Sequence, residues 1–251
     1  ERLLTIINDT CLRFGLTISF AKTKTQVFNN NELADKSSLL NINEQVIDNV
    51  RTFTYLGHVI TTEEGKCFTD HRRAAATAKF NQLRNVLCDI HVNVRTRRKI
   101  LESCVRSRLI YGTQAWYPKE QEMSKLEACW NELQRSMVKG GWSRKKAENE
   151  AEEEYAFKYS NEGIRKILKT TPLRDSINNQ YLKYVGHVSR MPNDAIPKQL
   201  LFAIPQRSHY RDPWLKIASM LDLPSEQVKK LTQSRNRFSE LVRQRAGSTS
   251  G

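Results

Sequence analysis

The beginning of the chain carries apolar side chains at the spacing of an amphipathic helix. Leu3, Leu4, Ile7, Cys11 and Phe14 would gather on one face of a helix over residues 1–14. Gly15 follows directly, and glycine is favoured where a helix closes in the left-handed conformation. The pattern therefore predicts a helix that ends at this glycine.

Short runs rich in β-branched and aromatic residues come next, separated by polar stretches. They predict strands at residues 16–20, 25–28, 42–47 and 53–60. A loop is predicted over residues 29–36 and a turn over residues 61–65. Residues 1–66 therefore have an α+β pattern.

From Cys67 onward the apolar spacing becomes helical. Two apolar stripes predict two packed helices. The first stripe consists of Phe80, Leu83, Leu87 and Ile90, and the second consists of Leu101, Cys104, Val105 and Leu109. The sequence of Ser124 to Glu127 is typical of a capping box that opens a third helix, which would end at Gly140 and Gly141. The predicted apolar face of that helix consists of Leu126, Cys129, Trp130, Leu133 and Met137.

The charge reverses along residues 144–160, from three basic residues to three glutamates, which is typical of a solvated connector. Beyond it, helices are predicted at residues 164–169, 172–188 and 224–245, with a loop over 191–213 and a low-complexity tail over 247–251. The whole chain is thus predicted to be α+β, with short antiparallel strands first and mainly helices after them.

Composition adds a strong positive charge to this picture. Lys and Arg number 41 against 27 Asp and Glu, giving a net charge of +14, and the pI is near 9.7. Such an excess favours a polyanionic partner, with nucleic acid the leading candidate, while a solvated surface or anionic lipid would explain the charge as well.

The five cysteines are widely spaced and contain no Cys-x-x-Cys pair, so neither a disulfide framework nor a zinc site is expected. Free thiols suit a reducing compartment, the nucleus or the cytoplasm. No apolar run reaches the roughly 20 residues of a membrane span, and no signal peptide is recognisable. The missing initiator Met suggests a piece of a longer protein.

Two segments resemble the last palm motifs of non-LTR (LINE-type) retrotransposon reverse transcriptases. Residues 14–24, FGLTISFAKTK, are similar to motif D, with Ser19 where the family has asparagine. Residues 53–60, FTYLGHVI, are similar to motif E, the hairpin called the primer grip, and the gap between the two segments also fits the family.

Later segments resemble the thumb of these enzymes and the stretch after it. Residues 98–105, 109–112 and 115–116 are similar to the thumb, with Gln114 in place of the usual acidic residue. Residues 184–194, YVGHVSRMPND, are similar to a segment found after the thumb. The resemblance implies a palm remnant at 1–66, a helical thumb at 67–143, a charged connector at 144–160 and a helical extension with a disordered tail at 161–251.

The resemblance implies the C-terminal part of an RNA-directed DNA polymerase, whose partners are an RNA template and a DNA primer. In such enzymes aspartates that precede motif D hold two metal ions at the reacting phosphate. This sequence has no Asp-Asp pair, so no metal site or cofactor is expected in it and no polymerase activity by itself. Mg²⁺ is expected for the full-length enzyme.

Two alternatives remain at this point. One is a non-catalytic basic relic or co-opted module that binds nucleic acid, and the other is a structural fragment that does not fold independently.

The resemblance assigns Lys22 a catalytic role, protonation of the departing pyrophosphate, with Lys24 as the fallback and as a nucleic-acid contact. Both lysines could instead be solvated charges beside a strand. Tyr55, Leu56, Gly57 and His58 would form the primer grip. Its alternative is a small buried hairpin with Tyr55 and Val59 in the core.

A basic set in the thumb is predicted to follow phosphates without reading sequence. It consists of Arg72, Arg73, Lys79, Arg84, Arg95, Arg97, Arg98, Lys99, Arg106 and Arg108. A solubilising surface is the alternative. His187 stands among apolar residues and is interpreted as a structural histidine without a catalytic role.

Overall fold

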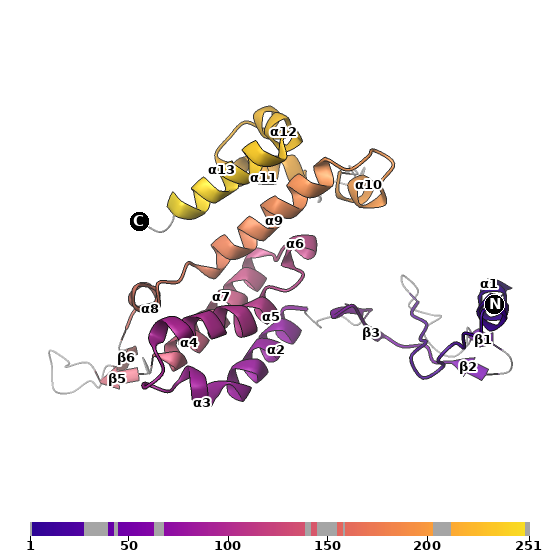
Figure 1. The fold of residues 1–251 in the computed structure, drawn as a ribbon, viewed down its shortest axis with the longest axis horizontal. Helices are drawn as coiled ribbons and strands as arrows, with labels where there is room; N and C mark the ends of the chain where they lie inside the picture. Colours follow the sequence, from indigo (N-terminus) through magenta and orange to yellow (C-terminus); the bar gives the residue numbers. More distant parts are fainter. Residues whose placement is uncertain are drawn as a thin grey trace. The chain divides into compact units, whose positions relative to one another are not determined.

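The computed structural model describes residues 2–27, 40–42, 45–62, 68–138, 142–144, 155–157, 159–202 and 212–248. They belong to two compact units, residues 1–71 and residues 72–251. Most of the described residues are helical and the strands form short antiparallel pairs, so the predicted α+β class is confirmed (Figure 1).

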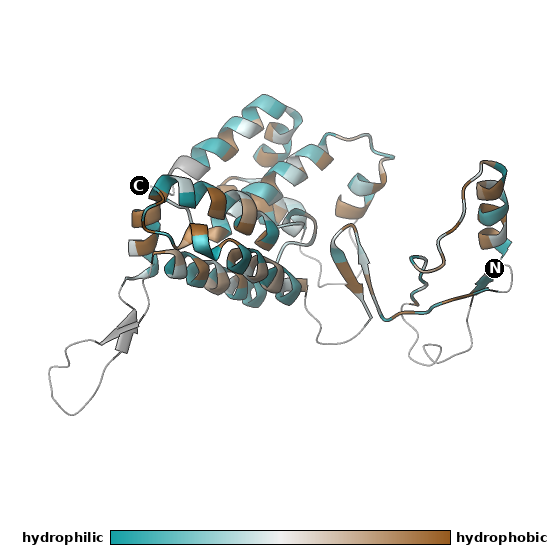
Figure 2. Cartoon of the chain, turned by 60° about the horizontal axis from the view of Figure 1, so that its bottom comes forward, coloured by the Kyte–Doolittle hydropathy of each residue, from teal (hydrophilic) through white to brown (hydrophobic). Residues whose placement is uncertain are grey.

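The first unit begins with the predicted helix, α1 (Arg2–Arg13), followed by Gly15 at a φ of 71°. The expected apolar face forms, but it stays open within the described residues. Leu3 is 69% exposed and Phe14 77%, and α1 carries apolar and polar bands side by side in Figure 2. The helix prediction is therefore confirmed, whereas its apolar spacing does not mark a buried core here.

Two hairpins follow in the first unit. β1 (Leu40–Ile42) pairs with β2 (Gln45–Ile47), and β3 (Thr52–Tyr55) pairs with β4 (His58–Thr61). The strand predicted at residues 16–20 is wrong, and of the one predicted at 25–28 only Thr25 forms an isolated bridge, to Asn49. A β-rich run becomes a strand only where a neighbouring backbone completes its hydrogen bonds, and the described residues offer none beside 16–20. Phe28 and the predicted loop over 29–36 lie outside the described residues.

The second unit is helical. Its elements are α2 (Phe68–Gln82, which starts within the first unit), α3 (Arg84–Leu87), α4 (Val94–Ile100), a π-helix (Leu101–Arg106), α5 (Ser107–Leu109), α6 (Thr113–Trp116), α7 (Glu120–Met137), β5 (Trp142–Arg144), β6 (Tyr155–Phe157), α8 (Asn161–Leu168), α9 (Leu173–Ser189), α10 (Ile196–Phe202), α11 (Pro213–Leu221), α12 (Ser225–Gln233) and α13 (Arg235–Ser248).

Several predicted boundaries are corrected by local contacts. The third helix begins at Glu120 rather than Ser124, because the Glu122 carboxylate accepts the Lys119 N–H at 2.8 Å and caps it one turn earlier. Ser124 lies inside the helix, where its hydroxyl donates to the Glu120 carbonyl at 3.0 Å.

Other corrections lie in the C-terminal half. The predicted loop at 191–213 contains α10, and the predicted helix at 224–245 is two helices separated at Ser234. The antiparallel pair β5 and β6 brackets much of the predicted connector, and α13 extends into the predicted tail as far as Ser248.

Two apolar cores hold these helices, and α9 enters both. Its first half contributes Leu173 and Ile177 to a core built with α2, the π-helix, α7 and α8. Its second half contributes Leu182 and Val185 to a core shared with α11, α12 and α13. In Figure 1 α9 runs between these two groups. The predicted face of the third helix, including Leu126, is buried in the first core as expected.

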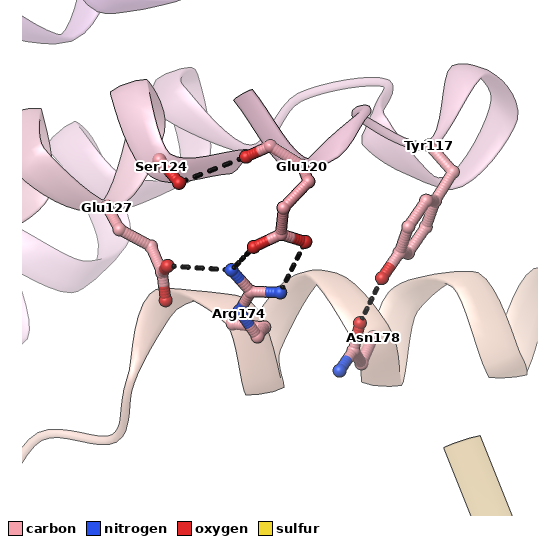
Figure 3. A network of polar contacts seen from close by, with 6 residues as sticks. All are labelled: Tyr117, Glu120, Ser124, Glu127, Arg174 and Asn178. Atoms are coloured by element: carbon pink, nitrogen blue, oxygen red, sulfur yellow. Dashed lines mark hydrogen bonds and ion pairs between the residues drawn. The ribbon is translucent and has the colours of Figure 1, made fainter. Parts of the chain in front are cut away.

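A polar network fixes the first half of α9 to α7 (Figure 3). The Arg174 guanidinium donates to both carboxylate oxygens of Glu120, at 2.9 and 2.5 Å, and to Glu127 at 3.2 Å. The hydrogen bond to Arg174 lowers the pKa of Glu120 below its ordinary value. One turn further along α9, Asn178 accepts a 2.6 Å hydrogen bond from the Tyr117 hydroxyl.

Close packing in the second core depends on Gly186. A Cβ atom at this position would lie 2.5 Å from Cε1 of Phe238 on α13, a distance at which the ring must shift. We expect Gly186→Ala to lower the free energy of unfolding by about 1–2 kcal/mol, because overpacking outweighs the helix propensity of about 1 kcal/mol gained by alanine. Urea denaturation followed by circular dichroism measures this change.

Gly163→Ala is the control for this prediction. Its added Cβ would meet Ser160 Oγ at 3.4 Å, an ordinary contact, so stability should be unchanged or slightly higher. Phe238→Leu combined with Gly186→Ala should recover part of the loss. Equal stability of the two alanine variants would contradict the role given to Gly186.

Candidate nucleic-acid interface

Within the first unit, Thr25 and Gln26, which directly follow the segment that resembles motif D, are hydrogen-bonded to residues 48–51 and to Ile60 of the segment that resembles motif E. The Thr25 N–H donates to the Asp48 carbonyl at 2.9 Å, and the Val50 N–H donates to the Thr25 carbonyl at 2.8 Å. The Gln26 side-chain amide donates to the carbonyls of Arg51 and Ile60, at 2.9 and 3.2 Å. The chain directly after the first segment is thereby joined to residues 48–51 and to Ile60 of β4.

The two lysines of this segment have different surroundings. Lys24 Nζ lies 2.5 Å from Asp48 Oδ2 in an ion pair, and its side chain is largely covered. Lys22 is exposed and sits in a turn closed by its own N–H to the Ser19 carbonyl, at 3.1 Å. Lys22 is therefore the more accessible of the two lysines, whereas the charge of Lys24 is already compensated by Asp48.

The tip of the β3–β4 hairpin is a two-residue turn with both residues in the left-handed region. Tyr55 faces His58 across it, while Leu56 has a φ of 48° and Gly57 a φ of 78°. Turns of this kind match the twist of the flanking strands, but a left-handed leucine costs roughly 1–2 kcal/mol. Strain of this sort persists at functional positions more often than elsewhere.

The side chains of this tip face outward. Tyr55 is 59% exposed and Leu56 72% exposed, so a buried hairpin with Tyr55 in its core is not what forms. His58 is half-buried and its ring stacks on Phe68, with centroids 5.1 Å apart and the planes at 7°. Tyr55, Leu56 and the backbone of Gly57 form the outward part of the tip, and His58 supports it.

Several members of the predicted basic set hold the helices together. Arg97 donates through Nε to the Val92 carbonyl at 2.9 Å, and through Nη1 to the carbonyls of Leu87 and Met137, each at 3.3 Å. Arg98 Nη1 donates to the carbonyls of Leu168 and Lys169, at 3.4 and 3.1 Å, where α8 ends. These two side chains complete helix C-termini that would otherwise leave carbonyls unsatisfied.

Arg72 and Arg73 are also covered. Arg72 is only 6% exposed, and its guanidinium carbon lies 5.0 Å from the centre of the Tyr111 ring. Burial lowers the pKa of Arg72, and Tyr111 partly opposes this effect. Arg73 is half-buried close to Cys129. Both residues stabilise the packing of α2.

The remaining cations of the set reach solvent to different degrees. Arg106 forms a 3.5 Å ion pair with Glu102, and Lys79 donates to the Gln82 side chain at 3.3 Å. The fully exposed members are Arg84, Arg95, Lys99 and Arg108. The sequence alone does not separate these residues from Arg97 and Arg98.

Two of the exposed cations share a face with two serines that the sequence did not single out, and Arg108 directly follows the last of these serines. Lys99, Ser103 and Ser107 follow Arg95 at steps of four, and the hydroxyls of the two serines donate to the carbonyls of Lys99 and Ser103, at 2.8 and 2.6 Å. We call Arg95, Lys99, Ser103, Ser107 and Arg108 the α4 strip. The spacing of the serines relative to Lys99 is the signal that could have revealed them.

The α4 strip presents exposed positive charge, which can contact phosphates without reading bases, whereas the protons of its two serine hydroxyls are already donated to backbone carbonyls. A Mg²⁺ ion would need a different set of groups. Among the described residues, no three His, Cys, Asp or Glu side chains come together as metal ligands.

Comparison with known proteins gives a limited likeness. The chain is similar to a putative uncharacterized transposon-derived protein from Caenorhabditis elegans, with 25% identity over 194 residues that make up 76% of this chain and 65% of that protein. The chain thus spans less than two thirds of that protein's length. No protein-family model matches the sequence. No solved structure matches it either.

The described helices include none that is long and apolar enough to cross a membrane.

Neighbouring arginines of α4 should differ in what they contribute to stability. We expect Arg97→Gln to lower the free energy of unfolding by about 1–3 kcal/mol, because part-buried carbonyls of three residues lose a charged donor. Arg95→Gln, at an exposed position of the same helix, should change it by less than about 0.5 kcal/mol. Urea denaturation of both variants measures the difference, and equal losses would refute this division of the basic set.

Proposed function

We propose that this chain is the C-terminal part of a retrotransposon RNA-directed DNA polymerase and that it binds and positions primer-template nucleic acid. The similarity to a transposon-derived protein supports an origin in a transposable element. The finer assignment rests on the residues that resemble motifs D and E, the thumb and the segment after it.

The observation that carries the proposal is the hydrogen-bonded junction that joins residues 25–26 to residues 48–51, just before the β3–β4 hairpin, and to Ile60 within it. Motif D and the primer grip act on neighbouring parts of one substrate, so a polymerase needs them side by side. The exposed Lys22 and the exposed, strained tip at Leu56 and Gly57 are placed by the same small unit. A merely buried hairpin would not need an outward leucine in the left-handed region.

The roles follow from the chemistry of each group. Lys22 would donate a proton to the departing pyrophosphate, and the tip around Gly57 would let the primer backbone approach closely. The α4 strip would follow phosphates of the duplex. The metal-binding aspartates would come from sequence outside this chain.

The role of Lys22 predicts a specific rate effect in a longer reading frame that supplies those aspartates. We expect Lys22→Ala to slow single-nucleotide incorporation by about ten- to a thousandfold while primer-template affinity stays nearly unchanged, because a general acid acts in the transition state. Single-turnover extension with labelled primer measures this rate.

Lys24→Ala is the matched control, since its ammonium is already paired with Asp48. It should change the rate much less than Lys22→Ala does. A silent Lys22→Ala variant, or a larger effect from Lys24→Ala, would remove the general-acid assignment.

The α4 strip predicts how binding responds to salt. Each phosphate contact adds about 0.9 to the slope of log affinity against log salt concentration for duplex DNA, through counterion release. Changing Arg95, Lys99 and Arg108 together to Gln should flatten that slope by about two to three. Fluorescence anisotropy with labelled duplex and hybrid oligonucleotides measures it.

The comparison removes equal charge at exposed cations on other elements, Lys125, Lys230 and Arg237, also changed to Gln. This control triple should flatten the slope by less than about one. Equal flattening by both triples would mean diffuse attraction to a basic protein, and the α4 strip would lose its role.

A further inference from the structure

Helix α13 runs antiparallel to the second half of α9. At the end of α9, Arg190 Nη1 donates to the Thr232 carbonyl at 2.9 Å, just before α13 begins. One turn earlier, Gly186 lies against Phe238 of α13. Near the C-terminal end of α13, Arg245 is close enough to Tyr117 to affect its pKa, and Tyr117 is hydrogen-bonded to Asn178 on α9. Burial raises the pKa of Tyr117, and the positive charge of Arg245 is among those that oppose this rise. The end of α13 is therefore near the middle of α9.

Cationic residues follow both helices beside this contact. On α9, Lys183 and His187 come directly after Leu182 and Gly186, which face the core and α13. On α13, Ser239 and Arg243 come directly after the buried Phe238 and Val242. When two right-handed helices pack antiparallel, the residue directly after a contact residue on one helix and the residue directly after a contact residue on the other helix lie on the same side of the interface.

Arg190 is four residues after Gly186, and Arg235 is three residues before Phe238, so both also lie on that side of the interface. We call the resulting surface the α9–α13 seam, and it consists of Lys183, His187, Arg190, Arg235, Ser239 and Arg243. Lys183, His187, Arg235 and Arg243 are exposed, and the other two are half-buried.

The seam keeps like charges together. Burial lowers the pKa of Arg190, and the nearby charge of Arg235 lowers it further. The second half of α9, residues 181–189, contains no acidic residue, and α13 contains one, Glu240, which is two positions after Phe238 and so points away from the seam. Repulsion of this kind is relieved when an anion binds between the charges.

We propose that the α9–α13 seam is a second nucleic-acid-binding surface, on which two rows of cations contact the phosphate backbone without sequence preference. The proposal goes beyond the α4 strip, because it gives a role to helices that follow the thumb-like segment and it rests on different residues. Two such surfaces on one compact unit would raise the affinity for a long strand through effective concentration.

The test changes Lys183, Arg235 and Arg243 together to Gln, and leaves Arg190 in place because it donates to Thr232. In salt titrations with labelled RNA and DNA, this triple should flatten the slope by about two to three. The control triple at Lys125, Lys230 and Arg237 should flatten it by less than about one. Arg237 is the closest match, since it lies on the other flank of the same helix.

Stability provides a second readout. Arg235→Gln alone should leave the Tm unchanged or raise it, because it removes repulsion from Arg190, while it weakens nucleic-acid binding. A merely structural arginine would lower the Tm when it is lost. If the triple does not fold, Lys183→Gln with Arg243→Gln replaces it and should flatten the slope by about one to two.

The outcomes separate this proposal from the proposed function. A seam triple that behaves like the control, beside an α4-strip triple that flattens the slope, would overturn the seam and keep the function. The reverse would overturn the α4 strip alone. Displacement of RNA from the protein by poly-glutamate as readily as by unlabelled RNA would indicate an acidic protein partner and would also overturn the seam.

Discussion

The second unit depends on the sharing of one helix between two cores. Leu173 and Ile177 of α9 pack with the helices that precede it in the chain, and Leu182 and Val185 pack with those that follow. Between the two groups, Tyr117 contacts Tyr181, and Lys216 Nζ lies 3.2 Å from the centre of the Tyr117 ring. A rotation of α9 would therefore disturb both cores at once, which fixes its orientation more firmly than either core alone.

Positive charge serves two purposes in the molecule. Arg97, Arg98 and Arg174 are used to satisfy carbonyl and carboxylate oxygens inside the helical unit. Other cations, such as Lys99 and Arg243, are exposed. The net charge of +14 thus overstates how many cations face a partner.

Periodicity predicted most helices of this chain because a helix satisfies its own backbone hydrogen bonds. It failed for residues 16–20, where a strand needs a neighbour that no local pattern reveals. The start of α7 was also misplaced, because Ser124 to Glu127 has the signature of a capping box whereas the cap that forms is the hydrogen bond from the Lys119 N–H to the Glu122 carboxylate.

Only part of the candidate site could be predicted from the sequence. The turn at Leu56 and Gly57 follows from a local pattern, whereas the covering of Arg97 and Arg98 depends on carbonyls up to 71 residues away. Arg95 and Arg97 look alike in the sequence. They differ only in the folded chain, where the side chain of Arg97 donates to carbonyls at helix ends and that of Arg95 is exposed.

The anchoring of α8 has a consequence for how the chain tolerates insertion. Arg98 reaches its C-terminal carbonyls, and Arg135 of α7 donates to the Tyr159 carbonyl at 2.6 Å and to Asn161, just before and at its start. Both ends of this helix are held by residues that precede the stretch between α7 and α8, so its position does not depend on the length of that stretch. For loops in general, doubling the length costs only about 0.6 kcal/mol of closure entropy. The helical unit should accordingly keep its packing when the stretch of chain between α7 and α8 is lengthened.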